Sequence, residues 1–65
     1  MIKTEDIKEL GEFIKIKLLC QKAGLKYNTI AAKMKRNSPL KTTESEALEL
    51  ALTDYFELIK KKLKL

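Results

Sequence analysis

The stretch IKLLCQKAGLKYNTIAAKMKR, residues 16–36, decides the fold of this 65-residue chain. Gly24 divides it into two segments in which apolar residues recur at helical spacing. Glycine adopts the left-handed conformation that ends a helix without a steric penalty from a Cβ atom, so the first segment is expected to end as a helix near Ala23. The second segment is expected to be helical over residues 27–36. Two short helices joined by a glycine turn are therefore predicted at the centre of the chain.

The segment on the N-terminal side is expected to be helical as well. Thr4 suits the start of a helix, because its side-chain oxygen can accept a free backbone N–H, and two acids follow it. Gly11 and the dense apolar residues after it leave two interpretations open. One is a single helix to about Lys22, and the other is two helices with a joint near residues 13–15. We favour two helices.

A long helix is predicted on the C-terminal side, after Pro39 has ended the helix of residues 27–36. Thr43 and Glu46 stand three residues apart, which fits a capping box at its start. The helix is expected over about residues 43–63. Its apolar residues are Ala47, Leu48, Ala51, Leu52, Tyr55, Phe56, Ile59 and Leu63.

These segments predict an all-α fold, a small bundle of four to five helices in one domain of residues 1–65. A core of this size supplies only ~3–5 kcal/mol unless something else stabilises it. Cys20 is the only cysteine and there is no histidine. An intramolecular disulfide is thus excluded, and a metal site of nitrogen or sulfur ligands is not expected. The free cysteine and the absence of a membrane-length apolar run point to a cytoplasmic protein.

Charge is distributed unevenly along the chain. Residues 13–41 contain eight cations and no acid, whereas residues 42–59 contain five acids and no cation. A block of one sign repels itself, so it is typical of a surface that meets a partner of opposite charge. The alternative is a lysine-rich surface that is only solvated. The block therefore suggests a polyanionic partner, and the residue pattern inside it decides which kind.

That pattern resembles the Cro and phage-repressor type of helix-turn-helix protein over residues 16–36. Cys20 occupies the place of the small residue where two helices cross, Gly24 follows four residues later, Leu25 anchors the turn, and Ile30 anchors the next helix. The similarity continues into SPLKTTESEALELAL, which looks like the connection and packing helix of small members. Two positions depart from the family, since Ile16 stands where glutamine is frequent and Cys20 where alanine is usual.

The resemblance implies a recognition helix over about residues 27–36 that enters the major groove of duplex DNA. Burial of Ile30 on this helix turns the opposite side outward. Asn28 is the most informative candidate, because its amide can pair with adenine N7 and N6, although asparagine is equally suited to cap the helix. The residues expected to read bases are Lys26, Tyr27, Asn28, Ala31, Ala32 and Lys35.

A second set is expected to contact phosphates, which fixes the register on DNA without reading sequence. Its members are Lys15, Lys17, Lys22, Lys33, Arg36, Asn37, Ser38 and Lys41. A homodimer on two half-sites is also expected, with Phe56, Ile59 and Leu63 at its interface, because the last helix has more apolar surface than a small core needs. The basic end, residues 60–65, is interpreted as a solubilising tail.

The function expected from these features is sequence-specific binding of double-stranded DNA. The protein is expected to be a small phage- or plasmid-type transcriptional regulator that acts as a repressor. Catalysis is not expected, because the chain lacks a histidine, a phosphate-binding glycine loop, and a nucleophile beside a base. No cofactor, metal or small-molecule substrate is implied. The main alternative is a small protein-interaction module, antitoxin-like or phage-encoded, whose basic face meets an acidic protein. Peripheral membrane binding through the last helix is a further alternative.

Overall fold

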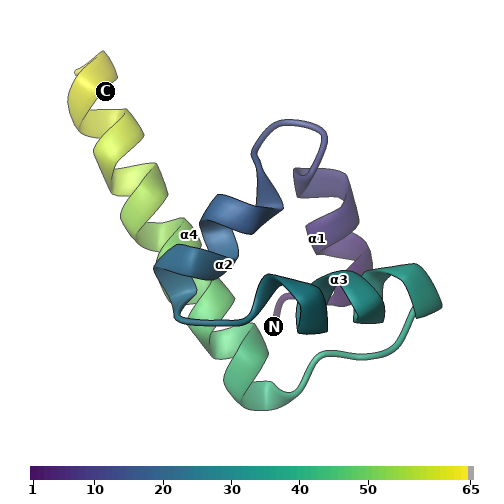
Figure 1. Cartoon of the computed structure of the whole chain (residues 1–65). Helices are drawn as coiled ribbons and strands as arrows, with labels where there is room; N and C mark the ends of the chain where they lie inside the picture. Colours follow the sequence, from purple (N-terminus) through teal and green to yellow (C-terminus); the bar gives the residue numbers. More distant parts are fainter. Residues whose placement is uncertain (65) are drawn as a thin grey trace.

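The computed structural model describes residues 1–64, and all of its regular structure is helical. The four helices are α1 (Thr4–Leu10), α2 (Ile16–Ala23), α3 (Tyr27–Arg36) and α4 (Thr42–Leu63). Figure 1 shows the three short helices on one side of a much longer α4, with α2 beside α4 and α1 and α3 farther from it. The all-α class and the number of helices agree with the prediction. None of these helices combines the length and the apolar composition that a bilayer-spanning segment needs.

The first two helices are separate, as we favoured. α1 ends at Leu10, and a turn over residues 11–15 leads into α2. The expected cap of α1 is wrong by one position, because Lys3 is the residue that precedes the helix and Thr4 lies inside it. The Thr4 hydroxyl instead donates a hydrogen bond of 2.6 Å to the carbonyl oxygen of Ser38. This side chain therefore joins α1 to the segment after α3, a tertiary contact that local sequence does not reveal.

The connection between α2 and α3 follows the prediction closely. Gly24 adopts the left-handed conformation at φ 75°, and the N–H of Leu25 donates to the carbonyl oxygen of Cys20 at 2.9 Å. This pattern closes the C-terminus of α2 in the manner of a Schellman motif. α3 then runs from Tyr27 to Arg36, and the residue that follows it, Asn37, is also left-handed at φ 56°. The chain thus turns sharply between two short helices whose bounds are those expected.

A small core holds the helices together. Its fully buried side chains come from all four helices and include Ile7, Leu19, Cys20, Ile30 and Leu48. Each helix contributes one or two of them, so every helix is anchored through the same cluster. Burial of a side chain of this kind contributes roughly 1.5–3 kcal/mol. Truncating any of the large buried side chains is therefore expected to destabilise the whole domain.

The start of α4 is fastened by polar contacts as well as by Leu48. The backbone N–H of Lys41 donates to Glu44 Oε1 at 2.8 Å, and Ser45 Oγ donates to the carbonyl oxygen of Ile2 at 2.8 Å. The predicted capping box of Thr43 and Glu46 is wrong, because the capping residue is Lys41, two positions earlier, and the acid of the box is Glu44. The sequence pattern missed Glu44 because this side chain also contacts other parts of the fold, and such contacts cannot be read from neighbouring residues.

The two halves of α4 have different surroundings. Leu48 and Ala51 are buried against α2, which is the helix that α4 contacts most. Phe56, Ile59 and Leu63 are exposed by 59%, 40% and 63%. In Figure 1 the C-terminal turns extend beyond α2 with no other helix beside them. Of the basic end interpreted above as a tail, residues 60–63 continue the helix, while Leu65 lies outside the described residues.

Candidate nucleic-acid interface

One side of α3 is buried and the other side is open to solvent. Ile30 is fully buried and Met34 is partly buried against the core. Among the residues expected to read bases, Lys26, Tyr27, Asn28 and Lys35 are exposed, whereas Ala31 and Ala32 are half-buried. The open side of α3 thus presents an amide, a phenol and cations, with two small side chains beside them.

The structure distinguishes between the two roles considered for Asn28. The residue that caps α3 is Lys26, and Asn28 occupies the second position inside the helix. No side-chain hydrogen bond caps this end of α3 in the described chain. The capping interpretation is therefore wrong. The amide of Asn28 lies on the exposed surface, where it is free to pair with another molecule.

The charges of α3 are all positive and lie at its two ends, with Lys26 before the first turn. Its first turn has no acid, and its last turn carries Lys33, Lys35 and Arg36. The N-terminal end of a helix carries a partial positive charge, which an acid in the first turn usually offsets. In α3 no acid of the first turn offsets this partial positive charge. The helix dipole therefore favours an anion at the N-terminal end of α3, and the side chains of the last turn favour one at the other end.

The residues expected to contact phosphates have different surroundings. Lys15 and Lys17 are exposed at the start of α2, and Arg36 and Lys41 are exposed near the end of α3 and the start of α4. Lys22 Nζ lies 4.0 Å from Asp54 Oδ2, with both side chains well exposed. Such surface pairs are worth ~0–1 kcal/mol, so Lys22 can leave Asp54 for a phosphate at little cost.

The two polar members of the same set are engaged within the protein. The Asn37 Oδ1 atom accepts a hydrogen bond from the Lys8 ammonium, and the carbonyl oxygen of Ser38 accepts one from Thr4. Asn37 is exposed and Ser38 is half-buried. Their described contacts therefore hold the end of α3 against α1, which is a structural role the sequence pattern did not indicate.

Lys33 requires a correction. Its ammonium pairs with Glu44 of α4, and the two side chains are exposed by only 14% and 11%. Burial alone would raise the pKa of the Glu44 carboxyl, but the hydrogen bonds from Lys33 and the Lys41 N–H and the charges of both lysines outweigh it and lower that pKa. Lys33 is thus an internal ion-pair partner that ties α3 to α4, and we remove it from the phosphate set.

Two residues near this surface were missed. Thr29 is exposed on α3 next to Asn28. Helical periodicity alone could have predicted this exposure, because Thr29 directly precedes the buried Ile30 and is therefore turned away from the buried side. Glu12 shares a shallow hollow with Lys35 between α1 and α3. This acid comes close to the cationic face only through the packing of α1, so no local signal indicated it.

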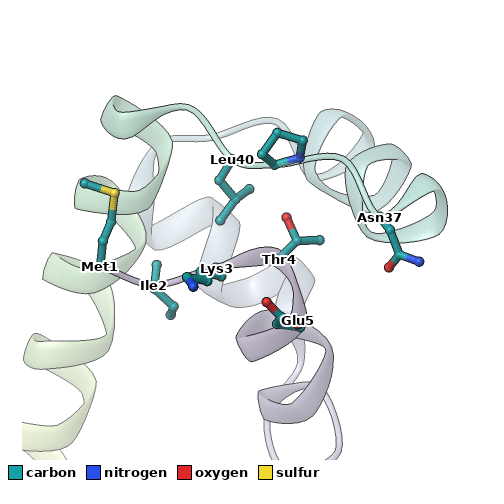
Figure 2. A pocket seen from close by; sticks show the side chains of 8 residues that line it. Met1, Ile2, Lys3, Thr4, Glu5, Asn37 and Leu40 are labelled. Carbon is teal, nitrogen blue, oxygen red and sulfur yellow. The ribbon is translucent and has the colours of Figure 1, made fainter.

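A second hollow lies where the N-terminal segment passes below the link from α3 to α4. Figure 2 shows Leu40 directed from the link toward the segment, and the hydroxyl of Thr4 directed toward the link. The hollow is lined by Met1, Ile2, Lys3, Thr4, Glu5, Asn37, Pro39 and Leu40. Within residues 1–64, every buried polar side-chain atom already has a hydrogen-bond partner. Nothing in this hollow therefore points to a ligand.

Comparison with known proteins adds no further assignment. No protein-family model, no curated protein and no solved structure matches this chain. The function must accordingly be argued from the geometry of α2, α3 and α4.

Proposed function

We propose that this protein binds double-stranded DNA with sequence specificity, as a helix-turn-helix regulator of the phage or plasmid repressor type. In this proposal α2 lies across the DNA backbone and α3 enters the major groove. The observation that carries it is the outward side of α3, on which the exposed Asn28 amide lies between exposed cations while Ile30 anchors the helix from below.

The shape of this side suits a groove. The major groove of B-DNA is ~12 Å wide and accepts one α-helix. Ala31 and Ala32 are small and half-buried, so they leave room for the helix to approach base edges. An alanine methyl can also touch the methyl group of thymine. Longer side chains at these two positions would hold the helix away from the bases.

Base discrimination is assigned first to Asn28. Its side-chain amide both donates and accepts, as a bidentate pair with adenine requires, and a good pair of this kind contributes ~1–3 kcal/mol of discrimination. Lys35 can reach guanine, and Lys26 and Tyr27 lie at the leading end of α3. Thr29 joins this set because it is exposed beside Asn28.

Positioning on the backbone is assigned to the exposed cations around α3. Lys15 and Lys17 lie where α2 begins, and Arg36 and Lys41 lie beyond the other end of α3. Lys22 joins them by leaving Asp54. Contacts with phosphates set the orientation of a protein on DNA and give most of the non-specific affinity.

Selection of bound duplexes from random DNA tests the proposal most directly. We expect an enriched motif that contains adenine, and steep loss of affinity as salt increases. Neutralising Z phosphates gives a slope of about −0.9Z in a plot of log affinity against log salt concentration. Failure to enrich any sequence, together with a flat salt dependence, would show that the DNA-binding proposal is wrong and would favour an acidic protein partner.

Two substitutions separate reading from positioning. Asn28→Ala should lower affinity for the selected site about 5- to 150-fold, the equivalent of ~1–3 kcal/mol, and leave binding to random DNA nearly unchanged. Lys17→Ala should weaken binding to both and reduce the salt slope by about one. Binding is measured on a short duplex with one half-site, so that oligomerisation does not contribute.

Lys61→Ala supplies the control, since Lys61 is an exposed cation on the distant end of α4. Its affinity for one half-site should equal that of the unmodified protein. Equal losses for Lys61→Ala and Lys17→Ala would mean that net charge, and not the surface around α3, governs binding.

A further inference from the structure

Helix α3 is anchored in the domain at few points. Among its described residues only Ile30 is buried, and the helices against which it packs are α1 and α2. Met34 packs against the core as well, but a methionine side chain is flexible and fixes an orientation poorly. One rigid apolar anchor does not by itself determine the direction in which a helix points. A second fixed contact is needed for that.

The ion pair between Lys33 and Glu44 supplies this second contact. Both side chains are largely shielded from solvent, and the Lys33 ammonium donates directly to Glu44 Oε1. Lys33 follows Ile30 by three positions, so the two anchors lie almost one turn apart, ~60° from each other around the axis of α3. Both lie at least ~140° from Asn28, at about 100° per residue. The pair therefore holds α3 from the side opposite to the exposed amide.

The carboxylate of Glu44 is itself held in place. Its Oε1 atom accepts the backbone N–H of Lys41 at 2.8 Å, at the start of α4. The neighbouring Ser45 is buried, and its Oγ donates to the carbonyl oxygen of Ile2 at 2.8 Å. A carboxylate in the first turn of a helix also lies at the positive end of the helix dipole. Lys33 is therefore tied to a fixed acceptor that belongs to α4.

We propose that the Lys33–Glu44 pair sets the orientation at which α3 presents Asn28 to a base, so that Lys33 is a positioning residue for sequence reading. This role rests on the proposed function. A bidentate pair with adenine requires the amide to be held within ~0.5 Å and ~10–20° of its best geometry. Lysine ammonium groups on flexible stems can follow a phosphate through larger shifts. A small tilt of α3 should therefore weaken base reading and leave the backbone contacts intact.

Binding of Lys33→Met protein to the selected half-site duplex and to a mixed-sequence duplex of the same length tests the proposal. Affinity for the selected duplex should fall at least about 5-fold, the effect of one lost base contact, while affinity for the mixed duplex changes by less than about twofold. The salt slope on the mixed duplex should not change. A lysine that contacted a phosphate would instead weaken both duplexes alike and lower the slope by about one. That result would overturn the proposal.

Two further variants separate positioning from a general loss of stability. Lys33→Arg keeps a cation suited to a shielded ion pair, so it should restore most of the preference for the selected duplex. Ala51→Gly is the control, because Ala51 is buried between α4 and α2 and glycine weakens a helix. It should lower the melting temperature and keep the preference at temperatures where circular dichroism shows a folded protein. Equal loss of preference in Ala51→Gly and Lys33→Met would contradict a positioning role.

Glu44→Gln is the second variant for the case in which Lys33→Met does not fold. Its amide oxygen can still accept the Lys41 N–H, while the charge that holds Lys33 is removed. The preference for the selected duplex should again fall, by a smaller factor than in Lys33→Met. An unchanged preference in folded Glu44→Gln protein would show that the ion pair does not orient α3 for reading.

The orientation of α3 can also be measured without DNA. Residual dipolar couplings of backbone N–H groups report the angle between α3 and α4 in solution. This angle should change in Lys33→Met and return in Lys33→Arg. An unchanged angle in folded Lys33→Met protein would overturn the assigned role of the pair. Lack of any preference in the unmodified protein would refute the proposed function itself, which no result on Lys33→Met can do, so the two failures are distinguishable.

Discussion

The two halves of α4 have the same apolar spacing and opposite surroundings. In the first half Leu48 is fully buried and Ala51 is 3% exposed, whereas in the second half Phe56 and Leu63 are about 60% exposed. The reason is length, because α2 has 8 residues and α4 has 22, or roughly 12 Å against 33 Å of helix. A short helix covers only part of a long one. Periodicity identifies the apolar side of a helix, but the lengths of its neighbours determine how much of it is buried.

Substitution by alanine in the two halves should give the largest contrast. Leu48→Ala removes a fully buried side chain and should cost ~2–5 kcal/mol, which approaches the whole stability of a domain this small. Ile59→Ala, at 40% exposure, should cost less than ~1 kcal/mol in the monomer. Urea unfolding of dilute protein, followed by circular dichroism, measures both. Equal costs would mean that the second half of α4 is covered in the monomer too.

The ion pairs of α4 offer a smaller contrast of the same kind. Lys33→Met leaves the buried Glu44 carboxylate without its ammonium partner and should cost ~1.5–3 kcal/mol. Lys22→Met breaks the exposed pair with Asp54 and should cost less than ~1 kcal/mol. The same urea titration applies. A cost of Lys22→Met as large as that of Lys33→Met would contradict the assigned difference in burial.

Acid titration of stability should give the smallest effect. The pKa of Glu44 is lowered in the folded chain from an ordinary value of 4.5 by its bonds to Lys33 and the Lys41 N–H, which outweigh its burial. A lowered pKa contributes stability above the unfolded value, and that contribution is lost as the pH falls through the folded value. The stability advantage over Glu44→Gln should therefore shrink below about pH 4.5.

Leu50→Ala is the control for this titration, because it changes no ionisable group and its difference from the unmodified protein should stay constant with pH. A difference between Glu44→Gln and the unmodified protein that is independent of pH between 3 and 7 would show that Glu44 does not hold this ion pair in solution.

The bounds of α2 and α3 could be predicted from sequence because local chemistry sets them. Gly24 adopts a left-handed conformation without the steric penalty of a Cβ atom, and Pro39 prevents α3 from continuing. The burial of Ile30 and the exposure of Asn28 follow from helical periodicity in the same way. For these residues the neighbours in sequence carry the necessary information.

The errors concern side chains whose partners are distant in sequence. Thr4 was expected to cap α1 but bonds Ser38, 34 positions away. Lys33 was expected to contact phosphates but pairs with Glu44 across the junction of α3 and α4. A propensity for caps, or for exposed charge, cannot anticipate a partner that only the folded chain brings near. Lys33 left the phosphate set for this reason.

The buried thiol of Cys20 has a practical consequence. Its side chain is inaccessible in the core, and desolvation raises the pKa of the thiol, so the reactive thiolate is scarce while the domain is closed. A thiol reagent can modify Cys20 only when the core opens. The rate at which Cys20 is modified therefore reports how often the four-helix core opens, and it can be measured on the protein without any substitution. Binding of any partner to the closed form should lower this rate.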